Sequence, residues 1–264
     1  MKSKNKFFTR LAILFIAAFS LTLSSCKKKE ATDEPIVITE TGTMLLHLHN
    51  YIDATDIGEL PNLSNPDDNG REITITKANL YITDIQLVKL DGTVYSFSGK
   101  KILKTFENVL YTIGDVPVGN YTTVKFKIGL DAATNAMQPT SSPDSIILNR
   151  SDMWYGPAAQ PEGYVFFNFQ GTIDTSSSLT EAQVPFSYKI GTNANLAQVT
   201  IPGINVSIVK DQAAVAHMVA DYTELFSGVQ LNDVGNLIIA TPADNSSTIA
   251  VRLVSNIPNM FKPE

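Results

Sequence analysis

The stretch "YTTVKFKIGL" (Tyr121 to Leu130) decides the fold class of this chain, because its apolar and polar side chains alternate. Val124, Phe126 and Ile128 fall on one face of an extended chain, and the two lysines between them fall on the other. A two-residue period is typical of a strand with one face in a core and one face in water. We therefore predict a half-buried β-strand here.

The same pattern recurs along much of the chain. The segment from Ile73 to Phe97 predicts two strands joined by a hairpin turn at "LDGT" (Leu90 to Thr93). Further strands are predicted at "GYVFFNFQG" (Gly163 to Gly171), "VPFSYKIG" (Val184 to Gly191), "LAQVTIPGINVSIV" (Leu196 to Val209) and "STIAVRLVSNI" (Ser247 to Ile257). One short helix is predicted near Asp221 to Phe226. Together these signals predict an all-β fold, an antiparallel β-sandwich that is immunoglobulin-like or related, with at most one or two short helices.

The amino-terminal residues have the three parts of a secretory signal. A basic head is followed by an apolar stretch from Leu11 to Leu23 and by small residues before a cysteine. The apolar stretch is shorter than the ~20 residues that a membrane span needs. Because "LSSC" (Leu23 to Cys26) matches the bacterial lipobox, we predict a lipoprotein signal peptide at residues 1–25 and lipidation of Cys26. The alternative is an ordinary cleaved signal with an incidental free cysteine.

An acylated Cys26 anchors a protein to a lipid bilayer without spanning it. Lys27, rather than aspartate, follows the cysteine, which favours an outer membrane lipoprotein that faces the periplasm or the cell surface. Residues 26–41 are polar and predict a flexible tether, and residues 42–264 predict a single β-sandwich domain. Cys26 is the only cysteine of the chain, so a disulfide or a cysteine-based metal cluster is excluded.

The chain is acidic. Removal of the four basic residues before Cys26 takes Lys+Arg from 20 to 16 against 26 Asp+Glu, a net charge of about −10. Nucleic-acid binding needs a basic surface, so no nucleic acid is expected as a partner. The sequence has no G-x-S-x-G elbow, Walker loop, H-E-x-x-H motif or dinucleotide fingerprint. We therefore expect a binding protein and not an enzyme.

The segment "LLHLHNYI" contains His47 and His49, two of only three histidines in the chain. On a strand, residues two apart point to the same face, so both imidazoles can reach one metal ion. Neutral imidazole suits copper, zinc and iron. The alternative interpretation is that the two histidines line the polar face of a first strand.

Several blocks of the sequence occur in an order that resembles the MbnP-like family of copper-binding proteins, named for a methanobactin-associated member and common among Bacteroidetes lipoproteins. The blocks are "GTMLLHLHNYI", "ITKANLYITDIQLVKLDG", "IGDVPVGNYTTVKFKIGLDAATN", "DMWYGPAAQPEGYVFFNFQGT", "VPFSYKIG", "ADYTELFSG" and "SNIPNMF". They run from about Gly42 to Phe261. The resemblance implies a β-rich sandwich that binds a single copper ion with histidine and a modified tryptophan. It also implies that, in some members, a di-haem peroxidase-like partner oxidises that tryptophan to kynurenine.

Carried over by this resemblance, His49 matches the family histidine near the end of the first strand, and Trp154 lies in the segment of the family tryptophans. The chain departs from the family at Lys189, where a second histidine is expected. His47 and His217 are the available replacements, and Met153 offers a thioether that suits Cu(I).

The resulting expectation is a copper site of His47, His49 and Met153 with Trp154 beside it. The alternative is a metal-free, surface-exposed interaction module, adhesin-like or glycan-binding, that uses the aromatic side chains of this loop.

Overall fold

The computed structural model describes residues 39–264 except 54, 59–63, 67–70, 158–161 and 232. Residues from Thr39 to Glu264 belong to one compact unit. The predicted signal peptide, Cys26 and nearly all of the tether lie outside the described residues. Within the described part of the chain, every helix is too short or too polar to cross a bilayer.

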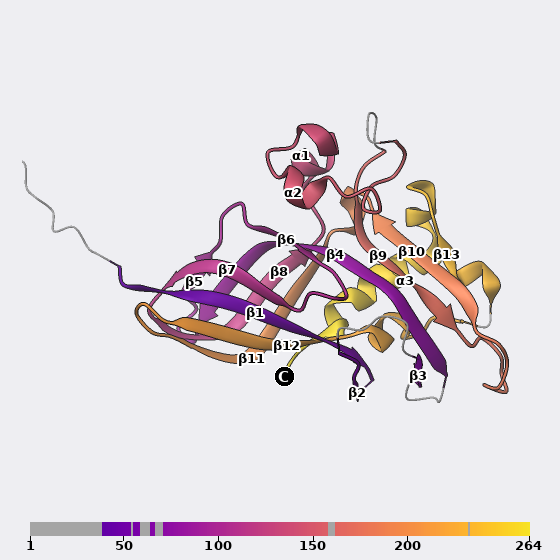
Figure 1. Ribbon diagram of the computed structural model, residues 1–264, viewed down its shortest axis with the longest axis horizontal. Coiled ribbons are helices and arrows are strands. Elements are labelled where there is room, and N and C mark those ends of the chain that lie inside the picture. Colours follow the sequence, from indigo (N-terminus) through magenta and orange to yellow (C-terminus); the bar gives the residue numbers. More distant parts are fainter. Residues whose placement is uncertain (1–38, 54, 59–63, 67–70, 158–161, 232) are drawn as a thin grey trace, which may run out of the picture. The chain divides into compact units, whose positions relative to one another are not determined.

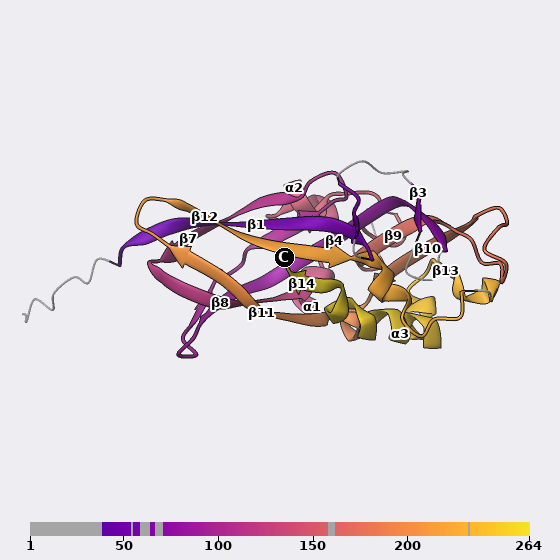
Figure 2. The same ribbon diagram turned by 90° about the horizontal axis from the view of Figure 1, so that it is seen from below.

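Two sheets form the unit (Figures 1 and 2). The small sheet has the strand order β14 (Phe261–Pro263), β12 (Ala213–Asp221), β1 (Thr41–Ile52) and β2 (Thr55–Asp56), with β7 (Leu110–Pro117) also paired to β1. The large sheet has the order β11 (Ala197–Ile208), β8 (Gly119–Ile128), β4 (Glu72–Lys89), β9 (Val165–Ile173), β10 (Val184–Gly191) and β13 (Ile238–Ile239). Three short strands also pair with β4: β3 (Ser64–Pro66), β5 (Val94–Ser96) and β6 (Lys101–Lys104). The predicted β-sandwich and the hairpin between β4 and β5 are confirmed.

Most strand pairs are antiparallel, as predicted, but two are not. β1 and β12 are parallel, and so are β10 and β13, so both sheets are mixed. Two neighbouring parallel strands need a long connection between them, and most of the chain lies between β1 and β12 in the sequence. The alternation of side chains within a strand does not show whether its neighbour runs parallel or antiparallel. The two parallel pairs could therefore not be predicted from the sequence pattern.

The helices are short. The α-helices are α1 (Ala132–Asn135), α2 (Ser145–Leu148) and α3 (Thr248–Asn256), and the 3-10 helices are η1 (Pro139–Ser141), η2 (Asn193–Asn195), η3 (Tyr222–Phe226), η4 (Val234–Asn236), η5 (Ala243–Ser246) and η6 (Ile257–Met260). The short helix predicted near Asp221 to Phe226 is η3. The strand predicted from Ser247 to Ile257 is wrong, because this segment is α3 and the start of η6. The Ser247 side chain accepts a hydrogen bond from the Ala250 amide and so caps the helix, and Ala250, Leu253 and Ile257 are buried at helical spacing.

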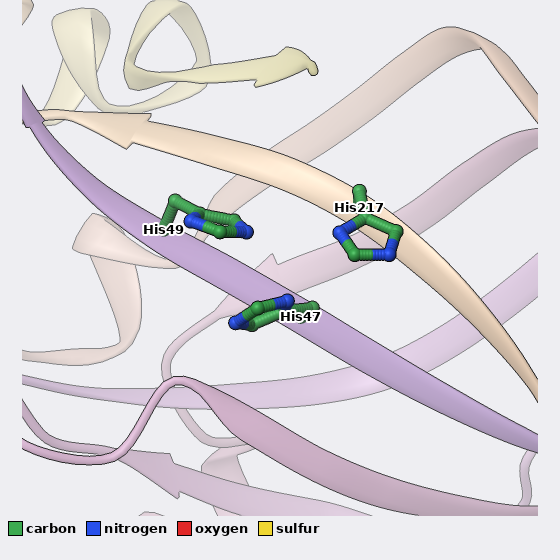
Figure 3. A group of neighbouring side chains, drawn as sticks. All are labelled: His47, His49 and His217. Carbon is green, nitrogen blue, oxygen red and sulfur yellow. The ribbon is translucent and has the colours of Figure 1, made fainter. Parts of the chain in front are cut away.

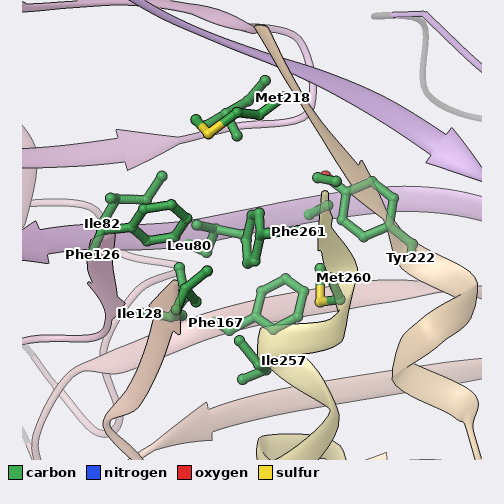
Figure 4. Close-up of a cluster of buried hydrophobic side chains, with 14 of the residues drawn as sticks. Leu80, Ile82, Phe126, Ile128, Phe167, Met218, Tyr222, Ile257, Met260 and Phe261 are labelled. Carbon is green, nitrogen blue, oxygen red and sulfur yellow. The ribbon is translucent and has the colours of Figure 1, made fainter. Parts of the chain in front are cut away.

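The main core lies between the two sheets. Leu46 and Leu48 face inward from β1, and Phe126 faces inward from β8, as its alternation predicted. The ring of Phe126 meets that of Phe261 edge-on, with centroids 5.1 Å apart (Figure 4). Full burial of each such side chain stabilises the fold by about 1.5–3 kcal/mol.

A second, smaller cluster lies on the other face of the large sheet. In β4, Leu80 and Ile82 point into the main core, while Tyr81 between them points the opposite way. The cluster around Tyr81 consists of Leu130, Leu148, Met153, Trp154, Tyr164 and Phe166. The large sheet is therefore covered on both faces over part of its length.

A buried lysine joins β1 and β6 to η3. Lys104 is fully buried, and its Nζ donates hydrogen bonds to Asn50 Oδ1 (2.7 Å), the Thr105 carbonyl (3.1 Å) and the Tyr222 hydroxyl (3.3 Å). The Tyr222 hydroxyl in turn donates to Asn50 Oδ1 at 2.9 Å. Asn50 directly follows His49, so this network holds the end of β1 in place.

Candidate metal centre

His47 and His49 lie on the outer face of the small sheet. Both alternate along β1 with Leu46 and Leu48, which are completely buried in the main core. The period of two therefore forces both imidazoles to the side away from the core. Their ring centroids are 3.9 Å apart.

His217 joins them from β12. The parallel pairing of β1 and β12 places His47 directly opposite His217, and both neighbours of His217 on β12 are in register with inward residues of β1. The His217 ring centroid is 5.1 Å from that of His47 and 5.9 Å from that of His49. Figure 3 shows the three imidazoles on one side of the two strands. All three histidines of the chain thus meet at one place.

Two carboxylates border the three imidazoles. Asp56 Oδ2 lies 3.4 Å from His49 Nδ1, and Glu264 Oε2 lies 3.3 Å from both His49 Nε2 and His217 Nδ1. His49 Nε2 is buried and has no hydrogen-bond partner among the described residues, although the Glu264 oxygen lies 3.3 Å from it. Desolvation, and then the negative charges of Asp56 and Glu264, raise the pKa of the neighbouring Tyr51.

The donor set fits a metal ion. One ligand nitrogen from each of the three histidines lies within 4.8 Å of the others. Copper and zinc bind imidazole nitrogen at about 2.0 Å, so two donors on one ion are at most about 4 Å apart, and the three nitrogens would have to approach one another by about 1 Å through side-chain rotation. A buried nitrogen without a hydrogen bond, such as His49 Nε2, costs about 1–3 kcal/mol, and a metal ion would satisfy it.

The structure does not bring Met153 and Trp154 to these histidines. Both belong to the cluster around Tyr81, on the outer face of the large sheet, whereas the histidines are on the outer face of the small sheet. The main core lies between the two places. The composite site of His47, His49, Met153 and Trp154 is therefore not formed, and the third donor is His217.

Lys189 lies on the same face of β10 as the Tyr81 cluster, since its neighbours Tyr188 and Ile190 point into the main core. Its backbone carbonyl accepts hydrogen bonds from the Tyr155 hydroxyl and from Asn245 Nδ2. The position of the expected family histidine is thus close to the tryptophan segment and remote from the three histidines of this chain.

The aromatic side chains of the loop are not available for stacking on a ligand. Trp154 is 9% exposed and Tyr155 is buried. Burial, only partly opposed by the hydrogen bond with Asn245, raises the pKa of Tyr155 above its ordinary value. Trp154 instead forms an isolated bridge with Tyr164 and packs beside the start of β9. Its role in this fold is to cover one end of the large sheet.

The sequence singled out His217 only as the remaining histidine of the chain, and the segment that contains it was not predicted as a strand. Its place beside His47 comes from the pairing of β12 with β1. No sequence pattern pointed to Glu264 or Asp56 as part of a metal site.

A family model described as MbnP matches residues 41–244. Among solved structures, the chain is similar to "MbnP from Methylosinus trichosporium", with a TM-score of 0.50 and 15% sequence identity over 71% of this chain and 78% of that chain. At this identity the likeness concerns the fold. No curated protein sequence matches the chain.

Proposed function

The chain belongs to the MbnP family, and we propose that it is a copper-binding protein of the cell envelope that holds one copper ion between His47, His49 and His217. The observation that carries this proposal is the convergence of all three histidines, from two strands far apart in the sequence, on one face of the small sheet.

Copper is favoured by the donors and by the family. Imidazole nitrogen is a good ligand for copper, and Cu(II) binds a given nitrogen and oxygen site more tightly than the other divalent first-row metals do. The resemblance to copper-binding relatives points to the same ion. The bound ion would link β1 to β12 and so stabilise the small sheet. The role proposed is binding, not catalysis.

The place in the cell follows from the leader sequence. Acylation of Cys26 would tether the domain to the outer membrane, on its periplasmic or outer side, by a flexible segment. A di-haem peroxidase-like partner would have to reach Trp154, of which 9% is exposed. The proposed copper site is separate from Trp154, so it does not depend on oxidation of that residue.

The metal-free interaction module is the less supported function. Its glycan-binding form needs aromatic rings that a sugar can stack on, and Trp154 and Tyr155 are buried. Three clustered imidazoles beside two carboxylates are also an unusual arrangement for a simple polar surface.

Copper titration of the full chain, purified in detergent after removal of metal, tests the proposal. We expect one Cu(II) per chain with sub-micromolar affinity, and an electron paramagnetic resonance spectrum with splitting from several nitrogens. Replacement of any one histidine by alanine should weaken binding, whereas Thr200→Ala, on the edge strand β11, should not. Wild-type binding weaker than micromolar, or binding that survives all three replacements, would refute the proposal.

A further inference from the structure

We propose that Glu264 supplies a fourth, oxygen ligand to this metal site and that Asp56 orients His49 toward the ion, so that the site holds copper as Cu(II) in preference to Cu(I). This inference rests on the proposed function. It adds two residues, a mixed nitrogen and oxygen donor set and an oxidation state. Glu264 lies outside the region that the family model matches.

Glu264 is the best placed oxygen donor. A single atom, Oε2, lies 3.3 Å from His49 Nε2 and 3.3 Å from His217 Nδ1. Neighbouring ligands bound at about 2.0–2.1 Å to one ion are about 2.9 Å apart in a tetragonal site and about 3.3 Å apart in a tetrahedral one, so this oxygen lies close to a ligand's spacing from two of the imidazoles.

The fold holds Glu264 at this position. β14 pairs with β12 so that Pro263 is opposite Met218, and the Glu264 amide donates to the His217 carbonyl at 3.4 Å. Met218 points into the core, so Glu264, which follows Pro263 directly after β14, faces the histidine side of the small sheet. Phe261 anchors the other end of β14 in the main core.

Asp56 contacts the nitrogen of His49 that points away from Glu264. Its Oδ2 is 3.4 Å from His49 Nδ1, and its Oδ1 accepts a hydrogen bond from the Gly58 amide at 2.8 Å, which fixes the carboxylate. A proton on Nδ1, attracted by the nearby Asp56 carboxylate, would leave the lone pair of Nε2 for the metal. His49 Nε2 is buried and has no hydrogen-bond partner among the described residues. Asp56 is thus a positioning residue.

Donor type and charge both favour Cu(II). Three imidazole nitrogens and one carboxylate oxygen suit Cu(II), whereas Cu(I) prefers sulfur. The thioether of Met153, which would favour Cu(I), lies on the other side of the sandwich. The charges of Asp56 and Glu264 balance those of a divalent ion, while with Cu(I) the same group would carry a net negative charge.

The test compares the full-length wild type with Glu264→Gln, Asp56→Asn and Asp56→Glu. Asp115→Asn is the matched control, since Asp115 is an exposed carboxylate on β7 of the same sheet. Cu(II) and Cu(I) affinities are measured separately, by competition with a chelator of each ion. Electron paramagnetic resonance of the Cu(II) forms and the unfolding temperatures of the metal-free proteins are also recorded.

We expect Glu264→Gln to weaken Cu(II) binding on the order of 100-fold and to change the resonance spectrum, and Asp56→Asn to weaken it about 10-fold. Cu(I) affinity should change less than about threefold in Glu264→Gln, whereas Asp56→Asn acts through His49 and is compared with Asp56→Glu, which should recover most of its loss. The metal-free variants and Asp115→Asn should unfold as the wild type does, which would show that the effect is on the metal and not on the fold.

The two proposals fail differently. A wild type that does not bind Cu(II) would overturn the proposed function and this inference with it. A wild type that binds Cu(II), with affinity and spectrum unchanged in Glu264→Gln, would overturn this inference alone. Equal losses of Cu(I) and Cu(II) affinity in Glu264→Gln would overturn the proposed preference for Cu(II).

Discussion

Copper should raise the unfolding temperature of the wild type, and His217→Ala should remove most of that rise without disturbing the metal-free fold. A ligand present at 100 times its Kd stabilises the native state by about 2.7 kcal/mol. The entropy of unfolding is about 2.1 cal/mol/K per residue, or about 0.5 kcal/mol/K for a compact unit of this size. The expected rise for the wild type is therefore about 6 °C.

The His217 imidazole is 51% exposed and lies outside the core, so its loss should change the stability of the metal-free protein by no more than about 0.5 kcal/mol. If the loss of one of three imidazoles weakens copper binding about 100-fold, the same copper concentration equals the new Kd. The stabilisation then falls to about 0.4 kcal/mol, a rise of about 1 °C.

Scanning calorimetry of the full chain at several copper concentrations measures both quantities. Val215→Ala is the control, because Val215 lies two residues earlier on the same face of β12 and offers no ligand atom. It should keep the full rise of about 6 °C. A copper-induced rise of equal size in His217→Ala would refute the assignment of His217 as a ligand.

Three further predictions concern the rest of the fold. Lys104→Ala should lower the free energy of unfolding by about 3 kcal/mol in urea titrations, because it opens a cavity and removes a donor to Asn50 Oδ1. Lys104→Met fills the space and should lower that free energy by less, so equal losses in the two variants would contradict this. Burial raises the pKa of Asp152, but the hydrogen bond and charge of Lys77 outweigh it and hold that pKa below its usual range. The contribution of Asp152 to stability is thus present above the unfolded pKa of about 3.9 and is lost as pH falls through the lower folded pKa. In urea unfolding from pH 6 to pH 3, Asp152→Asn should therefore lose less stability in acid than the wild type. Equal losses of unfolding free energy in the two proteins would disprove this. The fluorescence emission of Trp154 should be blue-shifted relative to free tryptophan and should be quenched only weakly by acrylamide, because the indole is buried. Quenching as efficient as that of free tryptophan would show that the indole is exposed.

Much of the fold could be predicted from local sequence. The alternation from Tyr121 to Leu130 and around His47 and His49 gave the strands and their buried faces correctly, because a strand repeats every two residues whatever its neighbour. The error from Ser247 to Ile257 has a local cause as well. This apolar run is compatible with either a strand or a helix. In the structure, Ser247 caps a helix, and Ala250 and Leu253 are buried on one side of it.

The site could be predicted only in part. His47 and His49 share a face by spacing alone, but His217 joins them through the register of β1 with β12, which no local pattern reveals. Glu264 depends on the pairing of β14 with β12. The family resemblance, now confirmed by the match of the family model, suggested Trp154 as a neighbour of His49. The two residues are instead on opposite sides of the core.

The parallel pairing of β1 with β12 also has a kinetic consequence. His47 and His49 are made early in synthesis, while His217 and Glu264 follow only after most of the two sheets has been made. Contacts between such distant segments form slowly, because the entropy of closing a long loop is lost before the contacts can stabilise the chain. Before that closure the chain offers only an i, i+2 pair of imidazoles, a weak chelate. A metal ion bound by all three histidines would therefore require the folded small sheet, and a chain that has not yet folded would offer only the weaker pair.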